Sequence, residues 1–132
     1  MEEKNNKVIE YYSNYDEQGR LEDSWGEIEF VRSVDILNRY LPNPPVTILD
    51  VGGAAGRYSY WLAEKGYQVH LIDPVPLHIQ QARENPISQT AKLASLSVGD
   101  ARRLEFENES VDAVLLMGPL YHLTEQSDRI KA

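Results

Sequence analysis

A glycine-rich turn and the acidic residues around it hold most of the chemistry that this sequence offers. The turn spans residues 52–56 and reads Gly-Gly-Ala-Ala-Gly, directly after an apolar run that contains Asp50. Asp73 ends the next apolar run, and Asp100 follows a third one. Glycine and alanine let a ligand approach the backbone closely, and the free N–H groups at a helix start donate hydrogen bonds to it. Carboxylates accept hydrogen bonds from hydroxyl and amine groups. The pattern indicates a binding site for a ligand that carries such groups.

The spacing of these residues indicates an adenosine derivative as the ligand. Asp73 lies about 20 residues after Gly52, which suits a carboxylate that accepts hydrogen bonds from both ribose hydroxyls. Asp100 is placed to accept from an exocyclic amine such as that of adenine, although an aspartate at such a position is as often a turn or cap residue.

Two other nucleotide-binding motifs are absent. The dinucleotide fingerprint G-x-G-x-x-G/A needs a small residue at its end, where Arg57 or Tyr58 stands, depending on which glycine begins it. A nicotinamide-dependent oxidoreductase is therefore disfavoured. The sequence also lacks the Gly-Lys-Ser/Thr of a triphosphate-binding loop.

Strands and helices must alternate to bring these residues together, and the sequence predicts that they do. Apolar residues at helical spacing predict a helix over 25–41, ended by prolines, after a shorter one near 8–12. Strands are expected at 46–51, 69–72, 93–98 and 111–117, with a helix that carries Tyr58, Trp61 and Leu62 and is closed by Gly66, and another at 77–83. Helical crossovers imply a parallel sheet, whose carboxyl edge receives Gly52, Asp73, Asp100 and Gly118.

Composition and charge narrow the class of protein. The chain has 132 residues, enough for about one domain, with 42% hydrophobic and 26% charged residues. Its formal net charge is -8 and no stretch gathers lysine and arginine, so nucleic acid is not expected as a partner. Without cysteine there is no disulfide or thiolate, and three scattered histidines do not indicate a metal site. The polar N-terminus and the lack of a long apolar run predict no signal peptide, no membrane span and a cytoplasmic location.

The turn and its surroundings resemble the class I S-adenosylmethionine (SAM)-dependent methyltransferase family. The first motif of that family is an acidic residue, any residue, and then Gly-x-Gly-x-Gly. Residues 50–56 match it except that Ala54 replaces the middle glycine. The resemblance continues through Asp73, residues 99–101 and residues 112–122, in the family's order. This combination is much more specific than any one of its pieces.

The resemblance implies that the cofactor is SAM and that the product is S-adenosylhomocysteine (SAH). The turn would pack on the methionine moiety with Asp50 near its ammonium group, Asp73 would hold the ribose, and Asp100 with the backbone of Ala101 would bind adenine. The cofactor-binding residues implied are Asp50, Gly52, Gly53, Ala54, Gly56, Asp73, Pro74, Asp100, Ala101, Met117 and Gly118, of which the last two would line the cleft under the sulfonium. No catalytic residue and no metal ion is expected, because the sulfonium is already an excellent leaving group.

The resemblance also implies the architecture, which is α/β: a Rossmann-like three-layer sandwich whose parallel sheet has the strand order 3-2-1-4. The family sheet has seven strands, whereas about four are expected here. The chain is therefore interpreted as the cofactor-binding part of a longer methyltransferase, truncated after strand four and not necessarily active alone. Residues 25–132 would form this domain and residues 1–24 a lead-in or lid segment. The open edge of strand four would invite self-association.

The methyl acceptor is expected to be a small molecule. Family members that methylate nucleobase amines often carry Asp or Asn and then Pro-Pro-Tyr after the fourth strand, and residues 117–120 lack that polar residue. The alternative is a module that binds SAM or SAH without turnover. His122 is the only histidine expected near the cleft, and packing is favoured over a general-base role because no partner is evident. His78 is expected to be structural.

Overall fold

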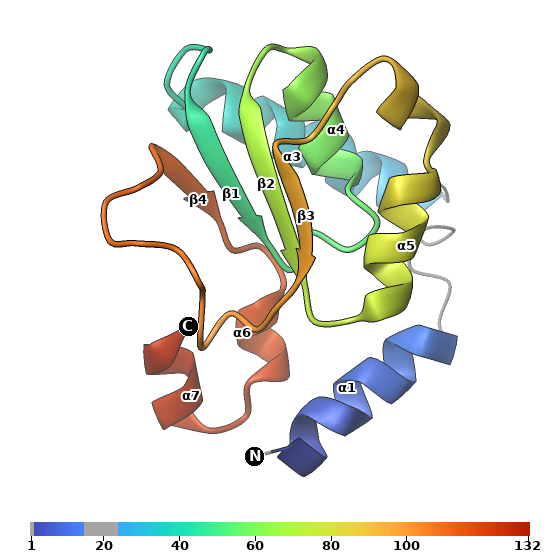
Figure 1. Ribbon diagram of the computed structural model, residues 1–132, viewed down its shortest axis with the longest axis vertical. Coiled ribbons are helices and arrows are strands. Elements are labelled where there is room, and N and C mark those ends of the chain that lie inside the picture. Colours follow the sequence, from blue (N-terminus) through green and yellow to red (C-terminus); the bar gives the residue numbers. More distant parts are fainter. Residues whose placement is uncertain (1, 15–23) are drawn as a thin grey trace. The chain divides into compact units, whose positions relative to one another are not determined.

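The computed structural model describes residues 2–14 and 24–132, which fall into two compact units divided between Asn43 and Pro44. The described part of the first unit contains helices α1 (Glu2–Asn14) and α3 (Ser24–Tyr40), as Figure 1 shows. Both predicted helices are confirmed, and α1 is longer than expected. The break expected after the first of them falls on residues 15–23, outside the described residues, and the lid role of this segment stays a prediction.

The second unit is built on a parallel sheet of four strands in the order β3-β2-β1-β4. This confirms the predicted α/β class and strand order. The strands are β1 (Thr47–Val51), β2 (Gln68–Asp73), β3 (Ser95–Val98) and β4 (Ala113–Leu115). In Figure 1 the arrows of β1, β2 and β3 point toward the same end of the sheet, where α6 begins. The residues that follow these strands are therefore delivered to one edge.

Strand β4 is shorter than predicted at both ends, and its first hydrogen bonds explain its late start. The Thr47 backbone N–H donates to a side-chain oxygen of Asp112 at 2.8 Å, and the Asp112 N–H donates to the Thr47 carbonyl at 2.9 Å. A carboxylate thus takes the place of a strand carbonyl, and regular pairing with β1 begins only at Ala113. Asp112 itself is exposed and lies just before the strand.

Two helices connect strands as predicted: α4 (Arg57–Glu64) joins β1 to β2, and α5 (Pro76–Glu84), followed by an unpredicted 3₁₀ turn, η1 (Pro86–Gln89), joins β2 to β3. Residues 99–112, which connect β3 to β4, contain no helix, and α6 (Pro119–His122) and α7 (Gln126–Lys131) follow β4. Gly66 closes the end of α4 with φ +95°, in the left-handed region that favours glycine. Pro76 begins α5, where its missing N–H costs no helical hydrogen bond.

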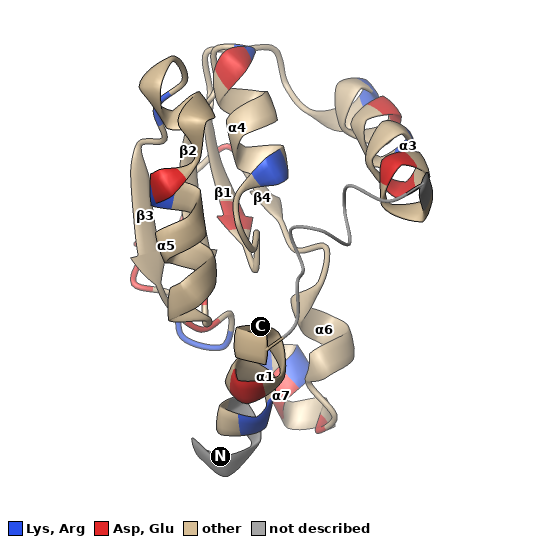
Figure 2. Cartoon of the chain, turned by 90° about the vertical axis from the view of Figure 1, so that its right-hand side faces the viewer, with Lys and Arg blue, Asp and Glu red and all other residues tan. Residues whose placement is uncertain are grey.

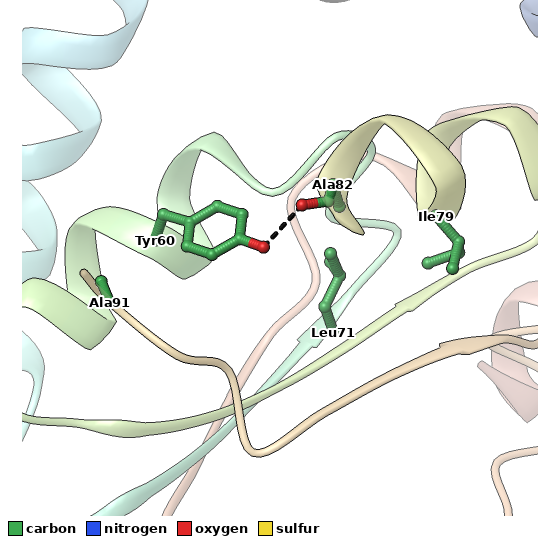
Figure 3. Close-up of a cluster of buried hydrophobic side chains, with 5 residues drawn as sticks. All are labelled: Tyr60, Leu71, Ile79, Ala82 and Ala91. Atoms are coloured by element: carbon green, nitrogen blue, oxygen red, sulfur yellow. Dashed lines mark hydrogen bonds between the residues drawn. The ribbon is translucent and has the colours of Figure 1, made fainter. Parts of the chain in front are cut away.

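One face of the sheet packs against α4 and α5. Figure 3 shows the cluster of Tyr60, Leu71, Ile79, Ala82 and Ala91, all at most 6% exposed. The Tyr60 hydroxyl donates a 2.6 Å hydrogen bond to the Ala82 carbonyl and so joins the two helices above β2. Buried aromatic area and a satisfied hydroxyl fix the helices on the sheet, and this determines where their N-termini lie.

The opposite face is covered by the segment between β3 and β4. Leu49, Val51 and Ile72 are at most 3% exposed and form the centre of this second cluster. The half-buried residues packed on them are Ala101, Leu104, Phe106, Val111 and Leu116. Because side chains alternate along β1, the neighbouring Asp50 faces the other side, toward α4.

Candidate functional site

The turn after β1 and the acid at the end of β2 lie against each other. The Ala54 backbone N–H donates a 2.9 Å hydrogen bond to a carboxylate oxygen of Asp73. The N–H groups of Gly52 and Gly53 both donate to the Ile72 carbonyl, at 2.7 and 3.3 Å. The two features on which the predicted nucleoside site depends therefore share one edge of the sheet.

The exits of the other two strands join the same edge. Gly99, just after β3, donates its N–H to the Asp73 carbonyl at 3.1 Å. Pro119, at the start of α6 after β4, packs so closely on Gly52 that a Cβ at Gly52 would lie 2.6 Å from its Cγ. All four strand exits are thus connected by direct contacts, as expected for parallel strands that end together.

Asp73 is almost fully enclosed, with 4% of its surface exposed. Its second carboxylate oxygen accepts the Val75 N–H and contacts Nδ1 of His78, each at 2.9 Å. His78 lies in the first turn of α5 and is 3% exposed. His78 was expected to be structural, and its contact with Asp73 was not predicted. The signal in the sequence was that His78 lies in the first turn of the helix that directly follows Asp73.

Asp50 is a second buried carboxylic acid behind the same turn, 4% exposed. The Ser59 hydroxyl, in the first turn of α4, donates a 2.6 Å hydrogen bond to it. Burial raises the pKa of Asp50 to about 6 from its usual 3.8, the Ser59 hydrogen bond opposes this, and the negative charge of Asp73 adds to it. The ionised form is therefore held in a place where a nearby cation would stabilise it.

The turn needs small residues for its own packing. Gly52 has φ +72°, and a Cβ at Gly53 would lie 2.5 Å from a carboxylate oxygen of Asp50. Ala54, which replaces the middle glycine of the family motif, adopts φ +51°, a left-handed conformation that is costly for any residue with a Cβ. The replacement of this glycine by Ala54 therefore carries a conformational cost in addition to the methyl group that it brings to the turn.

The Asp100 carboxylate, just after β3, is held by Arg102. One oxygen accepts the Arg102 backbone N–H at 2.9 Å and Nε at 3.0 Å, and the other accepts Nη2 at 2.6 Å. Asp100 therefore serves the turn in which it lies. Ala101 packs on the second core cluster, and the adenine-binding role of both residues stays a prediction.

The remaining predicted residues also lie at the carboxyl ends of the strands. Pro74 directly follows β2 and is half-buried, Met117 is 46% exposed, and Gly118 precedes α6. The His122 ring lies against Tyr121, with 4.2 Å between ring centroids. Within residues 2–14 and 24–132, no cluster of three or more potential metal-ligating side chains occurs. No helix in these ranges is both long and apolar enough for a membrane crossing.

The sheet order, the glycine-rich turn and the acid at the end of β2 define a Rossmann-like α/β protein. Residues 48–132 match the family model described as a methyltransferase domain, and the chain belongs to this family. The match covers all four strands apart from Thr47 and confirms the resemblance to class I SAM-dependent methyltransferases.

Individual relatives agree with this family. An uncharacterized methyltransferase of Mycobacterium tuberculosis is 33% identical over 76 residues, which are 58% of this chain and 29% of the relative. A ubiquinone biosynthesis O-methyltransferase of Methylocella silvestris is 35% identical over 94 residues, 67% of this chain and 35% of the relative. The crystal structure of a Pyrococcus horikoshii protein superposes with a TM-score of 0.67 at 27% identity, over 80% of this chain and 49% of that one. The chain spans about a third of the length of these curated relatives.

Proposed function

We propose that this chain binds SAM at the carboxyl edge of its sheet and serves methyl transfer to a small-molecule acceptor. The observation that carries the proposal is the hydrogen bond between the Ala54 N–H and the Asp73 carboxylate, because it joins the turn and the acid that the family motif places around one cofactor. Membership of the methyltransferase domain family supports it independently.

The residues present suit the parts of SAM one by one. Asp50 offers a buried carboxyl whose ionised form would gain from the cofactor's ammonium group, since burial and, to a smaller extent, the charge of Asp73 raise its pKa. Asp73 offers carboxylate oxygens already fixed by the Ala54 and Val75 N–H groups, so a ribose hydroxyl would meet an acceptor that needs no reorganisation. Gly52 and Gly53 keep side chains out of the turn that lies between Asp50 and Asp73.

When bound, SAM would supply a methyl group that is attached to a positively charged sulfur. This sulfur is a good leaving group in a direct displacement, which would yield SAH. The chain then contributes alignment. Holding the two reactants in line lowers much of the activation free energy of such a reaction. The fixed carboxylates and the rigid turn hold the donor. Met117 and Gly118, at the start of the segment after β4, are the residues proposed to lie under the sulfur.

A small acceptor is supported by the segment after β4 and by one relative. The sequence Met117-Gly118-Pro119-Leu120 offers no polar side chain that would orient a nucleobase amine. The Methylocella relative is named as a ubiquinone biosynthesis O-methyltransferase, a name that refers to small-molecule chemistry. A cytoplasmic location and self-association through the edge of β4 stay predictions.

Calorimetric titration with SAM, SAH and NAD tests the proposal. We expect SAM and SAH to bind and NAD not to bind, and we expect Asp73→Asn to weaken SAH binding. Asp112→Asn is the matched control, because Asp112 is also at a strand end but is exposed and engaged with Thr47. A preference for NAD, or equal losses in the two variants, would contradict the proposal. SAH binding without methyl transfer by the protein in any acceptor screen would favour the non-catalytic module instead.

A further inference from the structure

Arg102 lies between two aspartates that come from opposite sides of β4 in the sequence. Its Nε and Nη2 bind the Asp100 carboxylate after β3, and its Nη1 binds a carboxylate oxygen of Asp128 in α7 at 2.9 Å. The side chains of Arg102 and Asp128 are 11% and 12% exposed, and that of Asp100 is 28% exposed. In Figure 2 the stretch after β3 and helix α7 both carry charged segments.

The three side chains form a largely buried ion-pair network, unlike an exposed surface salt bridge. A guanidinium removed from water needs carboxylates in good geometry, and Arg102 meets Asp100 through two nitrogens of its planar fork. Hydrogen bonding to Asp100 raises the pKa of Arg102 above its usual range, burial opposes this, and Asp128 reinforces it. Arg102 therefore stays charged, and its contacts through two nitrogens make both Asp100 oxygens hydrogen-bond acceptors.

Helix α7 is fixed at its other side as well. Nη1 of Arg129 donates to the carbonyls of Leu123 and Thr124, at 2.6 and 2.8 Å, just after α6 ends. Because α6 begins beside Gly52, the contacts run from Asp100 through Arg102 and α7 to the glycine-rich turn. Both ends of the proposed cofactor site are thus connected to α7.

We propose that Arg102 is a positioning residue, which orients the Asp100 carboxylate so that the site selects an adenine base and which couples base binding to the docking of α7. The inference rests on the proposed function, because it takes the cofactor base to lie at Asp100. Arg102 fixes the plane of the carboxylate by holding both of its oxygens. A carboxylate oxygen accepts more than one hydrogen bond, so an oriented Asp100 accepts from the adenine amine in addition.

The selectivity follows from the two Asp100 oxygens, which Arg102 holds as hydrogen-bond acceptors. An ionised carboxylate only accepts hydrogen bonds, so it attracts the 6-amino group of adenine and repels the 6-carbonyl oxygen of hypoxanthine. If Arg102 were removed, Asp100 could rotate away from either base, and the difference between them would shrink. Lysine would keep the positive charge but lose the fork that fixes the plane.

The test compares SAH with S-inosylhomocysteine, its deaminated analogue, by calorimetry on the wild type and three variants. For Arg102→Ala and Arg102→Lys we expect the ratio of the two dissociation constants to fall at least about fivefold. Arg103→Ala is the matched control, since Arg103 is the next residue, has the same charge and is exposed; its ratio should equal that of the wild type. If Arg102→Ala does not fold, the ratio of dissociation constants measured for Arg102→Lys tests the proposal.

Hydrogen exchange supplies the second readout. SAH should protect the amides of α7 in the wild type and in Arg103→Ala, and this protection should be lost in Arg102→Lys and reduced in Asp128→Asn. An unchanged base ratio in a folded Arg102 variant, or ligand protection of α7 that survives in it, would overturn the role of Arg102 and leave the proposed function standing. A wild type that binds neither compound would overturn both.

Discussion

Replacing Asp50 by asparagine should flatten the pH dependence of stability. Asp50 is buried, and its pKa in the folded protein is raised to about 6 from 3.8, by burial first and by the charge of Asp73 in addition. A raised pKa means that the folded state holds the proton more tightly than the unfolded state. The stability that this proton provides is complete below about pH 4 and is lost as the pH rises through about 6.

The size of the effect follows from the two pKa values. One unit corresponds to about 1.4 kcal/mol, so a shift of about two units costs about 3 kcal/mol when both states are ionised. At about pH 4.5 only about 1 kcal/mol of this has been lost, because the folded state is still protonated. An asparagine at this position cannot ionise, so the difference in unfolding free energy between Asp50→Asn and the wild type should grow by about 2 kcal/mol between about pH 4.5 and 7.5.

Urea unfolding at a series of pH values measures this directly. The comparison between two pH values removes any constant cost of burying an amide, because that cost does not change with pH. Ser59→Ala is an informative second variant, because it removes the hydrogen bond that opposes the pKa shift of Asp50. In this variant the loss of stability with rising pH should be steeper than in the wild type and should extend to higher pH. Parallel stability curves for the wild type and Asp50→Asn would show that Asp50 titrates normally, and the reasoning from burial would be refuted.

Three further predictions concern the turn and Asp73. Ala54→Gly should stabilise the protein by about 1 kcal/mol by relieving the left-handed alanine, seen as a higher urea midpoint, whereas Ala55→Gly should not. Gly52→Ala should destabilise it by about 1–3 kcal/mol, because the new methyl meets Pro119 and φ is +72°, and an unchanged thermal midpoint would contradict the packing argument. Asp73→Ala should weaken SAH binding by at least about 1–3 kcal/mol in calorimetry, and unchanged affinity would place the ribose elsewhere.

The sheet was predictable because its strands carry strong local signals. The run from Val46 to Val51 is apolar apart from Thr47 and Asp50, which is typical of a central parallel strand, and Gly66 marks the end of the helix that follows. Parallel connectivity then places the strand exits at one edge whatever the side chains do. This is why the glycine-rich turn and Asp73 could be expected at the same edge without a structure, although the hydrogen bond between Ala54 and Asp73 was not predicted.

The contacts that were missed depend on tertiary placement. Arg102 and Asp128 are separated by the whole of β4, and no spacing rule connects a basic residue in a loop with an acid in a later helix. The approach of Pro119 to Gly52 depends on how sharply the chain turns after β4. The late start of β4 depends on the Asp112 carboxylate, which accepts a hydrogen bond in place of a strand carbonyl, and a pattern of apolar residues does not reveal this.

The two buried acids explain why a site of this kind lowers the stability of its fold. The cost of burying Asp73 is partly offset by hydrogen bonds from the N–H groups of Ala54 and Val75. Asp50 accepts a hydrogen bond from the Ser59 hydroxyl, but the nearby charge of Asp73 adds to the cost of ionising it. Packing alone would favour a neutral residue at position 50, since the ionised form carries the cost of its burial. A ligand that brings a cation to Asp50 would remove that cost only while bound.

Such a cation would also lower the pKa of Asp50 toward its usual value, so ligand binding and proton release are linked. Binding of SAH should therefore strengthen as the pH rises from about 5 to 7 and should release a proton near pH 5. In Asp50→Asn both effects should vanish, and calorimetry in two buffers of different ionisation enthalpy separates the proton release from the binding heat. A pH-independent affinity in the wild type would mean that the cation is not at Asp50.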